Sequence, residues 1–171
     1  LIKEARARVA QLEQQGASVD VHVVGRKGIG YFRYVGRALA AERTDITDRP
    51  TAEDAASIVD ALMADFVAGN LDAVYVVHAK FNSALSTPPT TLQVLPVEPP
   101  SAGAARQRDY LLTPSPEAIL TELLPLYVRN TVYRALVETA AAEQGARRTA
   151  MKSATDNAGE ILNLLKRTYN R

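Results

Sequence analysis

The residues best suited to chemistry lie in a glycine-rich stretch from Gly25 to Gly30, which follows an apolar run. A loop of this kind after a strand can hold a phosphate group with backbone N–H groups, and Arg26 and Lys27 would add positive charge. The glycine order matches neither the dinucleotide fingerprint nor the P-loop, because no Lys-Ser or Lys-Thr pair follows the glycines. We therefore favour a tight turn with solvated basic residues. A nucleotide-binding α/β enzyme that uses this loop is the alternative.

Other catalytic chemistry has little support in the sequence. His22 and His78 lie on separate predicted strands, and no carboxylate stands at metal-ligand spacing from either of them. The chain has no cysteine, which excludes disulfides, thiol nucleophiles and thiolate metal sites. We expect no catalytic residue, no metal site and no bound cofactor.

The composition indicates a chain with enough apolar residues for a hydrophobic core and with a net charge close to zero. It has 171 residues, of which 47% are hydrophobic, and a net charge of +1. This balance gives no reason to expect nucleic acid as a partner. No apolar run approaches the roughly 18 residues that span a bilayer, so we expect any membrane association to come through a partner rather than by insertion. The chain begins at Leu1 within a helical pattern, which indicates a fragment that has lost an earlier strand.

The first half alternates between helical and strand patterns. Apolar residues at helical spacing predict a helix that ends at Gly16, and alternation predicts a strand over residues 19–24. Thr51 and Asp54 form a capping box at the start of a second helix. Residues 73–81 are apolar on both faces, as in a central strand covered by helices, and residues 91–97 predict another strand.

The second half is dominated by one long helix. Ser115 is the expected N-cap, and Pro125 must bend or break the helix because proline removes a backbone hydrogen bond. Beyond Pro125 a 4-3 spacing predicts a coiled-coil seam with a polar middle. The alternative is a long helix that lies across its own domain. The seam positions are Val137, Ala141, Gln144, Arg148, Met151, Thr155, Ala158, Leu162, Leu165 and Tyr169.

Together these elements predict the α/β class, with a small mixed sheet in an α/β/α layered domain. We place the globular domain, without its first strand, at residues 1–114 and a helical segment at residues 115–171. The long coiled-coil helix begins at about residue 126, and we expect it to form half of an antiparallel coiled coil.

The residues from Glu143 to Ala158 carry a resemblance to a known family. They match the pattern Glu-x-x-x-Arg-x-x-Ala-Met-x-x-Ala-Thr-x-Asn-Ala, which is the C-terminal signature of the gamma subunit of bacterial F-type ATP synthases. Supporting matches are Val24 to Gly28, the Leu95-Pro96 pair and Tyr127 to Tyr133. The resemblance covers the whole chain, but only about the last three fifths of a gamma subunit, without its N-terminal helix, first strand and C-terminal tip.

The resemblance implies a central rotor shaft. In this family, proton or sodium flow turns a membrane ring, and the shaft forces the catalytic subunits through different nucleotide affinities without making or breaking a bond. The implied partners are the alpha and beta subunits, the epsilon subunit and the membrane ring of c subunits. The implied location is peripheral, on the cytoplasmic face of the inner membrane. A homodimeric coiled-coil scaffold is a further alternative.

The resemblance also implies two contact regions. The interface with the beta subunits and the partner helix would include Glu143, Arg147, Arg148, Met151 and Asn157. The segment from Asp109 to Pro114 resembles the part that contacts the membrane ring, with Tyr110, Leu112 and Thr113 as contact residues. Family members often carry Tyr and Glu at the last two of these positions, and this chain departs from that pattern at both.

Overall fold

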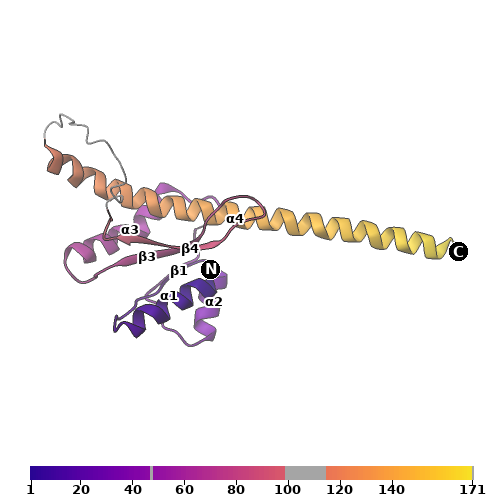
Figure 1. The fold of residues 1–171 in the computed structure, drawn as a ribbon, viewed down its shortest axis with the longest axis horizontal. Coiled ribbons are helices and arrows are strands. Elements are labelled where there is room, and N and C mark those ends of the chain that lie inside the picture. Colours follow the sequence, from indigo (N-terminus) through magenta and orange to yellow (C-terminus); the bar gives the residue numbers. More distant parts are fainter. Residues whose placement is uncertain (47, 99–114, 171) are drawn as a thin grey trace, which may run out of the picture.

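The structure is a computed structural model that describes residues 1–46, 48–98 and 115–170. Figure 1 shows α3 and α4 on one side of strands β3 and β4, with α1 and α2 on the other, and α4 projecting far beyond the domain. The α/β class expected from the sequence is confirmed. The elements are α1 (Ile2–Gln14), β1 (His22–Val24), α2 (Arg26–Tyr34), β2 (Ala41–Arg43), α3 (Ala52–Val67), β3 (Val74–Ala79), β4 (Pro89–Leu95) and α4 (Pro116–Tyr169).

The strands form two separate pairs within the described ranges. β1 and β2 are parallel, with His22 opposite Ala41, whereas β3 and β4 are antiparallel, with His78 opposite Thr90. Parallel and antiparallel pairing both occur, as expected for a mixed sheet, but in two separate sheets and not in the single sheet that we predicted. The connections explain the two orientations, because helix α2 links the parallel strands β1 and β2, whereas a loop over residues 80–88 links the antiparallel strands β3 and β4. β1 is also shorter than the predicted strand over residues 19–24, since its partner β2 has only 3 residues.

Strand β3 is covered on both faces, as its apolar pattern predicted. Val74 and Val76 pack against the core beside α3 and α4. On the opposite face, the guanidinium of Arg8 in α1 lies 4.3 Å from the ring centroid of Tyr75. Alternate residues therefore face different helices, as the two-residue period of a strand requires. In the described part of the chain β3 pairs with β4 alone, so it is not the central strand that the sequence suggested.

The hydrophobic core lies between α3, α4 and β4. The helices contribute residues four apart, which lie on one face, and β4 contributes its last two residues, both of which are buried. These side chains are between 0% and 6% exposed. Burial of this apolar surface fixes α4 to the domain along its first half. The core residues are Ala55, Val59, Val94, Leu95, Val128 and Val132.

The glycine-rich stretch is the start of helix α2 rather than the turn that we favoured, or a loop. Gly25 precedes the helix with a φ of 103°, a conformation that glycine adopts without strain. A Cβ atom at Gly28 would lie 2.8 Å from Cγ1 of Val23, so this glycine allows α2 to approach β1. Ile29 and Phe32 are buried on the inner face of the helix. Their packing outweighs the low helix propensity of the glycines.

The predicted helix starts are confirmed in atomic detail. The side chain of Thr51 accepts a hydrogen bond from the backbone N–H of Asp54, and the carboxylate of Asp54 accepts one from the backbone N–H of Thr51. Ser115 caps α4 by accepting a hydrogen bond of 3.2 Å from the backbone N–H of Ala118. Both caps satisfy donors that the first helical turn leaves free.

Pro125 does not break α4, which runs as one helix of 54 residues from Pro116 to Tyr169. Figure 1 shows it as a continuous ribbon. A proline inside a helix costs about 3 kcal/mol because one backbone hydrogen bond is lost. Val128 and Val132 are buried in the core directly after the proline, and this packing holds the helix together across it.

The close approach at Gly28 predicts different effects for two substitutions on one helix. Gly28→Ala forces a contact with Val23, whereas a Cβ atom at Gly30 meets nothing within 4 Å. Both changes bring the same gain in helix propensity, so the difference isolates the steric effect. We expect Gly28→Ala to be less stable than Gly30→Ala by about 1–3 kcal/mol in urea unfolding. Equal stabilities would show that α2 does not pack closely on β1.

Candidate functional site on the projecting helix

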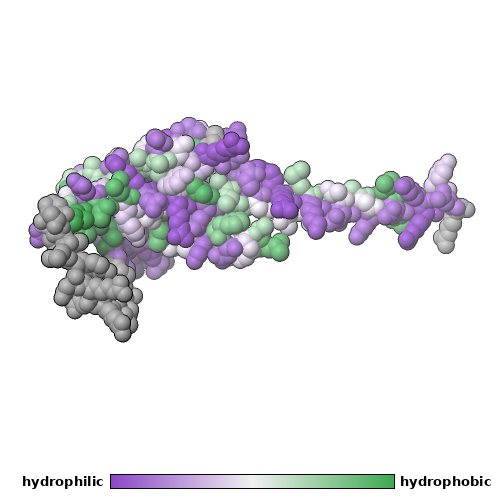
Figure 2. Space-filling view, turned by 90° about the horizontal axis from the view of Figure 1, so that it is seen from above, coloured by the Kyte–Doolittle hydropathy of each residue, from purple (hydrophilic) through white to green (hydrophobic). Residues whose placement is uncertain are grey.

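The second half of α4 stands free of the domain. Ala142 is the last residue of α4 that is buried, and residues 150–170 are all exposed. At 1.5 Å per residue this exposed end is about 30 Å long. Figure 1 shows it extending away from the other elements, and Figure 2 shows apolar and charged side chains alternating along it. An isolated helix has little stability of its own in water, so this end is suited to pairing with a partner.

The exposed end carries an apolar surface. The seam positions Met151, Leu162, Leu165 and Tyr169 have between 52% and 90% of their surface exposed. Val137, at the other end of the seam, is 39% exposed, so the stripe begins beside the domain and continues outward. The long helix therefore does not lie across its own domain along this half. Polar residues interrupt the seam at Gln144 and Arg148, but the large apolar side chains exposed near the tip indicate an interaction surface.

Two apolar residues outside the seam were missed by the sequence interpretation. Ile161 is 59% exposed and Leu164 is 64% exposed, and each is one position before a seam leucine. With about 100° per residue, they lie beside the seam rather than on it. The tip therefore presents an apolar arc wider than one coiled-coil stripe. The sequence does contain a signal for this wider arc, because Ile161 and Leu164 are three residues apart, as Leu162 and Leu165 are.

A polar cluster lies where α4 leaves the domain. The guanidinium of Arg147 contacts Oε1 of Glu143 at 2.5 Å and donates a hydrogen bond of 3.0 Å to Oε1 of Gln144. Gln144 in turn donates a hydrogen bond of 3.1 Å to Oδ2 of Asp48. The predicted pair four residues apart is therefore present, and Gln144 ties it to the globular domain. Because both charged side chains are more than half exposed, the pair adds only a few tenths of a kcal/mol to stability.

The other predicted interface residues lie at different places on the same helix. At about 100° per residue, Asn157 lies on the side of Glu143, about four turns further along, whereas Arg148 lies about 140° away around the axis. Met151 falls between Arg147 and Arg148 in direction. All three are exposed. The five residues therefore spread over about half of the circumference of the helix instead of forming one compact patch.

A buried polar contact anchors α4 to the sheet just before it leaves the domain. His78 of β3 is 8% exposed, and its Nε2 atom lies 3.3 Å from Oε2 of Glu138 in α4. The Nε atom of Arg134 donates a hydrogen bond of 2.8 Å to Oε1 of the same carboxylate. The backbone N–H of Ala79 donates one of 3.3 Å to the hydroxyl of Thr139. His78 thus has a structural role, as part of the joint between strand and helix.

The environment of Glu138 favours its charged form. The hydrogen bond from Arg134 lowers the pKa of this carboxyl, and the charge of Arg134 and the backbone N–H of Phe81 act in the same direction. Burial acts against them by penalising the charge. The net result is a pKa below the ordinary value. The carboxylate is therefore ionised at neutral pH and holds both basic partners.

Several predicted features lie elsewhere or have no structural counterpart. The expected ring-contact residues Tyr110, Leu112 and Thr113 lie outside the described residues. Within the described ranges, no group of three or more His, Asp or Glu residues is arranged to hold a metal ion. Among the described helices, none is both long and apolar enough to cross a membrane.

Comparisons with known proteins agree on one family. A family model described as ATP synthase matches residues 1–171. The ATP synthase gamma chain of Gemmatimonas aurantiaca is 65% identical over 172 residues, which cover 99% of this chain and 59% of that protein. The gamma chain of Frankia casuarinae is 44% identical over 170 residues, which cover 94% of this chain and 56% of that protein. The chain thus spans less than two thirds of the length of these relatives.

Two solved structures share the fold. The central stalk and c-ring structure of the mitochondrial ATP synthase of Tetrahymena thermophila aligns with a TM-score of 0.62 and 23% identity, covering 91% of this chain and 69% of that one. The rotor of the Euglena gracilis mitochondrial ATP synthase aligns with a TM-score of 0.59 and 16% identity, covering 96% and 66%. At these identities the likeness concerns the fold alone.

The anchoring contact predicts a pH-dependent contribution to stability. The folded state lowers the pKa of Glu138, so the unfolded chain binds more protons in acid. The contribution is complete above the ordinary glutamate pKa of about 4.3 and is lost as the pH falls through the folded value. We expect Glu138→Gln to cost about 1–3 kcal/mol near pH 7, since it removes the charge that faces buried His78 and weakens the hydrogen bond from Arg134. In urea unfolding, this difference from wild type should shrink as the pH is lowered to about 3.

Glu143→Gln is the matched control, because it makes the same change on the same helix at an exposed position. Its unfolding free energy should stay close to that of wild type at every pH. A Glu138→Gln variant as stable as wild type at neutral pH would show that the joint does not hold α4.

Proposed function

The chain belongs to the ATP synthase gamma chain family, and on that premise we propose that α4 is one side of the central rotor shaft of an F-type ATP synthase. The shaft would couple ion-driven rotation of a membrane ring to ATP synthesis or hydrolysis at the alpha and beta subunits. In this proposal the chain itself makes and breaks no bond. Its contribution is mechanical and is carried by the shape and surface of one helix.

The observation that carries the proposal is the exposed end of α4. Residues 150–170 are exposed along a continuous helix that the domain holds at its other end. The exposed apolar arc at the tip, which includes Ile161, Leu162, Leu164 and Leu165, would be covered by a second helix of the shaft and by the surrounding subunits. Burial of each of these side chains would contribute about 1.5–3 kcal/mol. A free helix end of this kind has no evident use inside a monomeric domain.

The polar cluster at the neck is suited to repeated contact with several partners. A shaft that turns inside a ring of subunits must favour a different conformation in each one without binding any of them tightly. Glu143 and Arg147 contribute little to the stability of the domain itself, because their pair is exposed. They are therefore free to exchange partners at low cost. We propose that they contact the beta subunits, together with Arg148, Met151 and Asn157.

We also propose contacts with the membrane ring and with the epsilon subunit. We propose that the segment containing Tyr110, Leu112 and Thr113 contacts the membrane ring of c subunits, and that the outer surface of the globular domain contacts the epsilon subunit. The complex would place this chain at the cytoplasmic face of the inner membrane as a peripheral component. The resemblance to gamma chains supports these partners.

The two alternatives from the sequence make different demands on the structure. A nucleotide-binding enzyme needs a glycine-rich loop, and residues 26–34 form a helix instead. A homodimeric scaffold would use the same exposed seam as the rotor. The full-length parent should therefore co-purify with alpha and beta subunits when these are present. A stable dimer of the parent that excludes both subunits in sedimentation would instead support the scaffold.

The rotor proposal predicts that Arg147 matters more for coupling than for folding. Arg147→Ala in the full-length parent removes an exposed ion pair worth a few tenths of a kcal/mol, so the melting temperature should fall by no more than about 2 °C. Loss of about 1 kcal/mol of contact with the beta subunits would slow synthesis about fivefold. The measurement is ATP synthesis driven by an ion gradient in membrane vesicles, alongside thermal unfolding of the purified subunit.

Arg33→Ala is the matched control, because Arg33 forms an exposed ion pair with Glu42 on the globular domain, away from α4. Its rate of synthesis should equal that of wild type. Unchanged synthesis in Arg147→Ala, combined with a large fall in melting temperature, would assign Arg147 a packing role and remove it from the proposed interface.

A further inference from the structure

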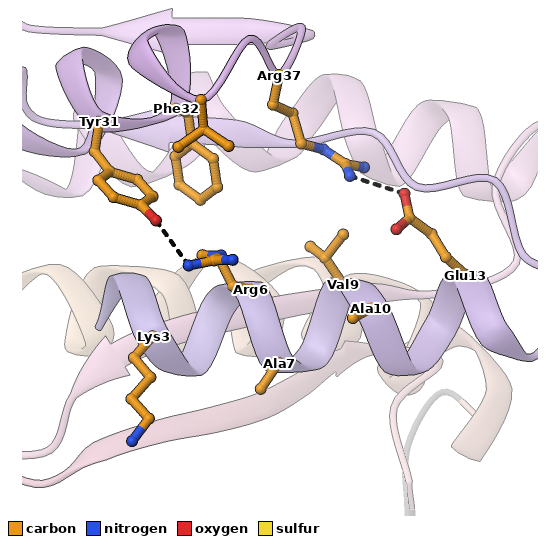
Figure 3. Close-up of a pocket in the computed structure, with 10 residues that line it drawn as sticks. Lys3, Arg6, Ala7, Val9, Ala10, Glu13, Tyr31, Phe32 and Arg37 are labelled. Carbon is orange, nitrogen blue, oxygen red and sulfur yellow. Dashed lines mark hydrogen bonds and ion pairs between the residues drawn. The ribbon is translucent and has the colours of Figure 1, made fainter.

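A groove of about 430 Å³ lies between helices α1 and α2, on the layer of the domain that faces away from α4. Its apolar lining includes Val9 of α1, Phe32 of α2 and Val35, which directly follows α2. Phe32 is only 5% exposed, whereas Val35 is 52% exposed, so the groove has a buried floor and an open rim. Figure 3 shows that the side chains of Val9, Arg6 and Glu13 point from α1 toward α2. The volume is within the range of small-molecule sites, about 300–1,000 Å³.

One end of the groove holds a positively charged group with unused hydrogen-bond donors. The Nη1 atom of Arg6 donates a hydrogen bond of 2.9 Å to the hydroxyl oxygen of Tyr31, which fixes the guanidinium over the groove. Arg6 forms no ion pair with a carboxylate in the part of the chain that the structure describes. A guanidinium has five N–H donors, so several remain for a ligand. Because the Tyr31 oxygen accepts from Arg6, its own O–H is also free to donate.

The other end of the groove is closed by a satisfied pair. Arg37 lies 2.8 Å from a carboxylate oxygen of Glu13 and also donates a hydrogen bond of 3.2 Å to the carbonyl of Val19. Figure 3 shows this pair joining α1 to the segment that follows α2, at the end opposite Tyr31. A ligand anion would therefore find its partner at Arg6 and not at Arg37. The groove is polar and cationic at one end and apolar along its middle.

The charge of this layer favours an anion. Residues 1–37, which include both helices, contain seven basic and three acidic side chains, although the whole chain has a net charge of only +1. An excess of one sign over one layer raises the local concentration of ligands of the opposite sign. Charge and shape therefore agree on a ligand with a negative head and an apolar body.

We propose that the groove binds a small amphiphilic carboxylate. Its carboxylate accepts hydrogen bonds from the guanidinium of Arg6 and the hydroxyl of Tyr31, and its apolar chain or ring lies over Val9 and Phe32. A planar carboxylate matches the fork geometry of a guanidinium, which makes such contacts stronger than those between neutral groups. The occupied site would join α1 to α2. The groove is remote from the projecting end of α4, so this proposal and the rotor proposal succeed or fail separately.

The test uses isothermal titration of the full-length parent with 4-phenylbutanoate. Its neutral amide, 4-phenylbutanamide, has the same apolar body without the charge and serves as the ligand control. We expect saturable binding of the carboxylate and at least about tenfold weaker binding of the amide, as expected for loss of a hydrogen-bonded charge. Arg6→Gln should weaken binding of the carboxylate by a similar factor. Tyr31→Phe should weaken it less, because only one neutral donor is lost.

Arg26→Gln is the matched protein control, since it removes the same charge from α2 outside the groove. It should bind the carboxylate as wild type does. Thermal unfolding of each variant without ligand checks that the fold is retained. The proposal is overturned by the absence of saturable binding, by equal binding of carboxylate and amide, or by Arg6→Gln and Arg26→Gln variants with equal affinity.

Discussion

The packing of α4 against α3, β3 and β4 determines which part of this long helix is covered by the domain and which part is exposed. Between Val128 and Ala142 the helix buries four small or medium apolar residues, and after Ala142 none is buried. At Gly145 a Cβ atom would lie 3.3 Å from the Cα atom of Ala84, and Thr149 is the last residue of the described helix that is partly covered. Beyond this point the domain has nothing left to cover the helix. The exposed end follows from the difference between a 54-residue helix and a small domain.

Local signals in the sequence were sufficient for most of the helices. Thr51 with Asp54 and Ser115 with Ala118 form caps whose partners are three residues apart, so the sequence alone shows them. Helix α2 was missed because its glycines suggest a loop, and the close approach of Gly28 to Val23, which explains one of these glycines, is visible only in the fold. The two separate strand pairs were missed for the same reason, since pairing depends on partners distant in the chain.

In the candidate site too, contacts within one helix could be predicted from the sequence, whereas contacts between elements could not. The contact between Glu143 and Arg147 was predictable because four residues place two side chains on one face of a helix. The joint between His78 and Glu138 was not, since sixty residues separate its members and neither has a distinctive neighbour in sequence. The tie between Asp48 and Gln144 spans 96 residues and was equally hidden. Periodicity reveals contacts within a helix, whereas contacts between elements need the fold.

The way in which α4 is held fits the proposed mechanical role. Arg129 forms two hydrogen bonds of 2.8 and 2.9 Å with the carboxylate of Asp60 in α3, and Glu138 contacts His78 in β3. Nine residues separate Arg129 from Glu138, which at about 100° per residue places them on opposite sides of the helix. If α4 rolled about its axis, both polar contacts would have to break together. Apolar packing resists separation of the helices but resists sliding less, because it has no fixed direction. Polar contacts on opposite faces of α4 would therefore oppose its rotation relative to the domain when a torque acts on the projecting end.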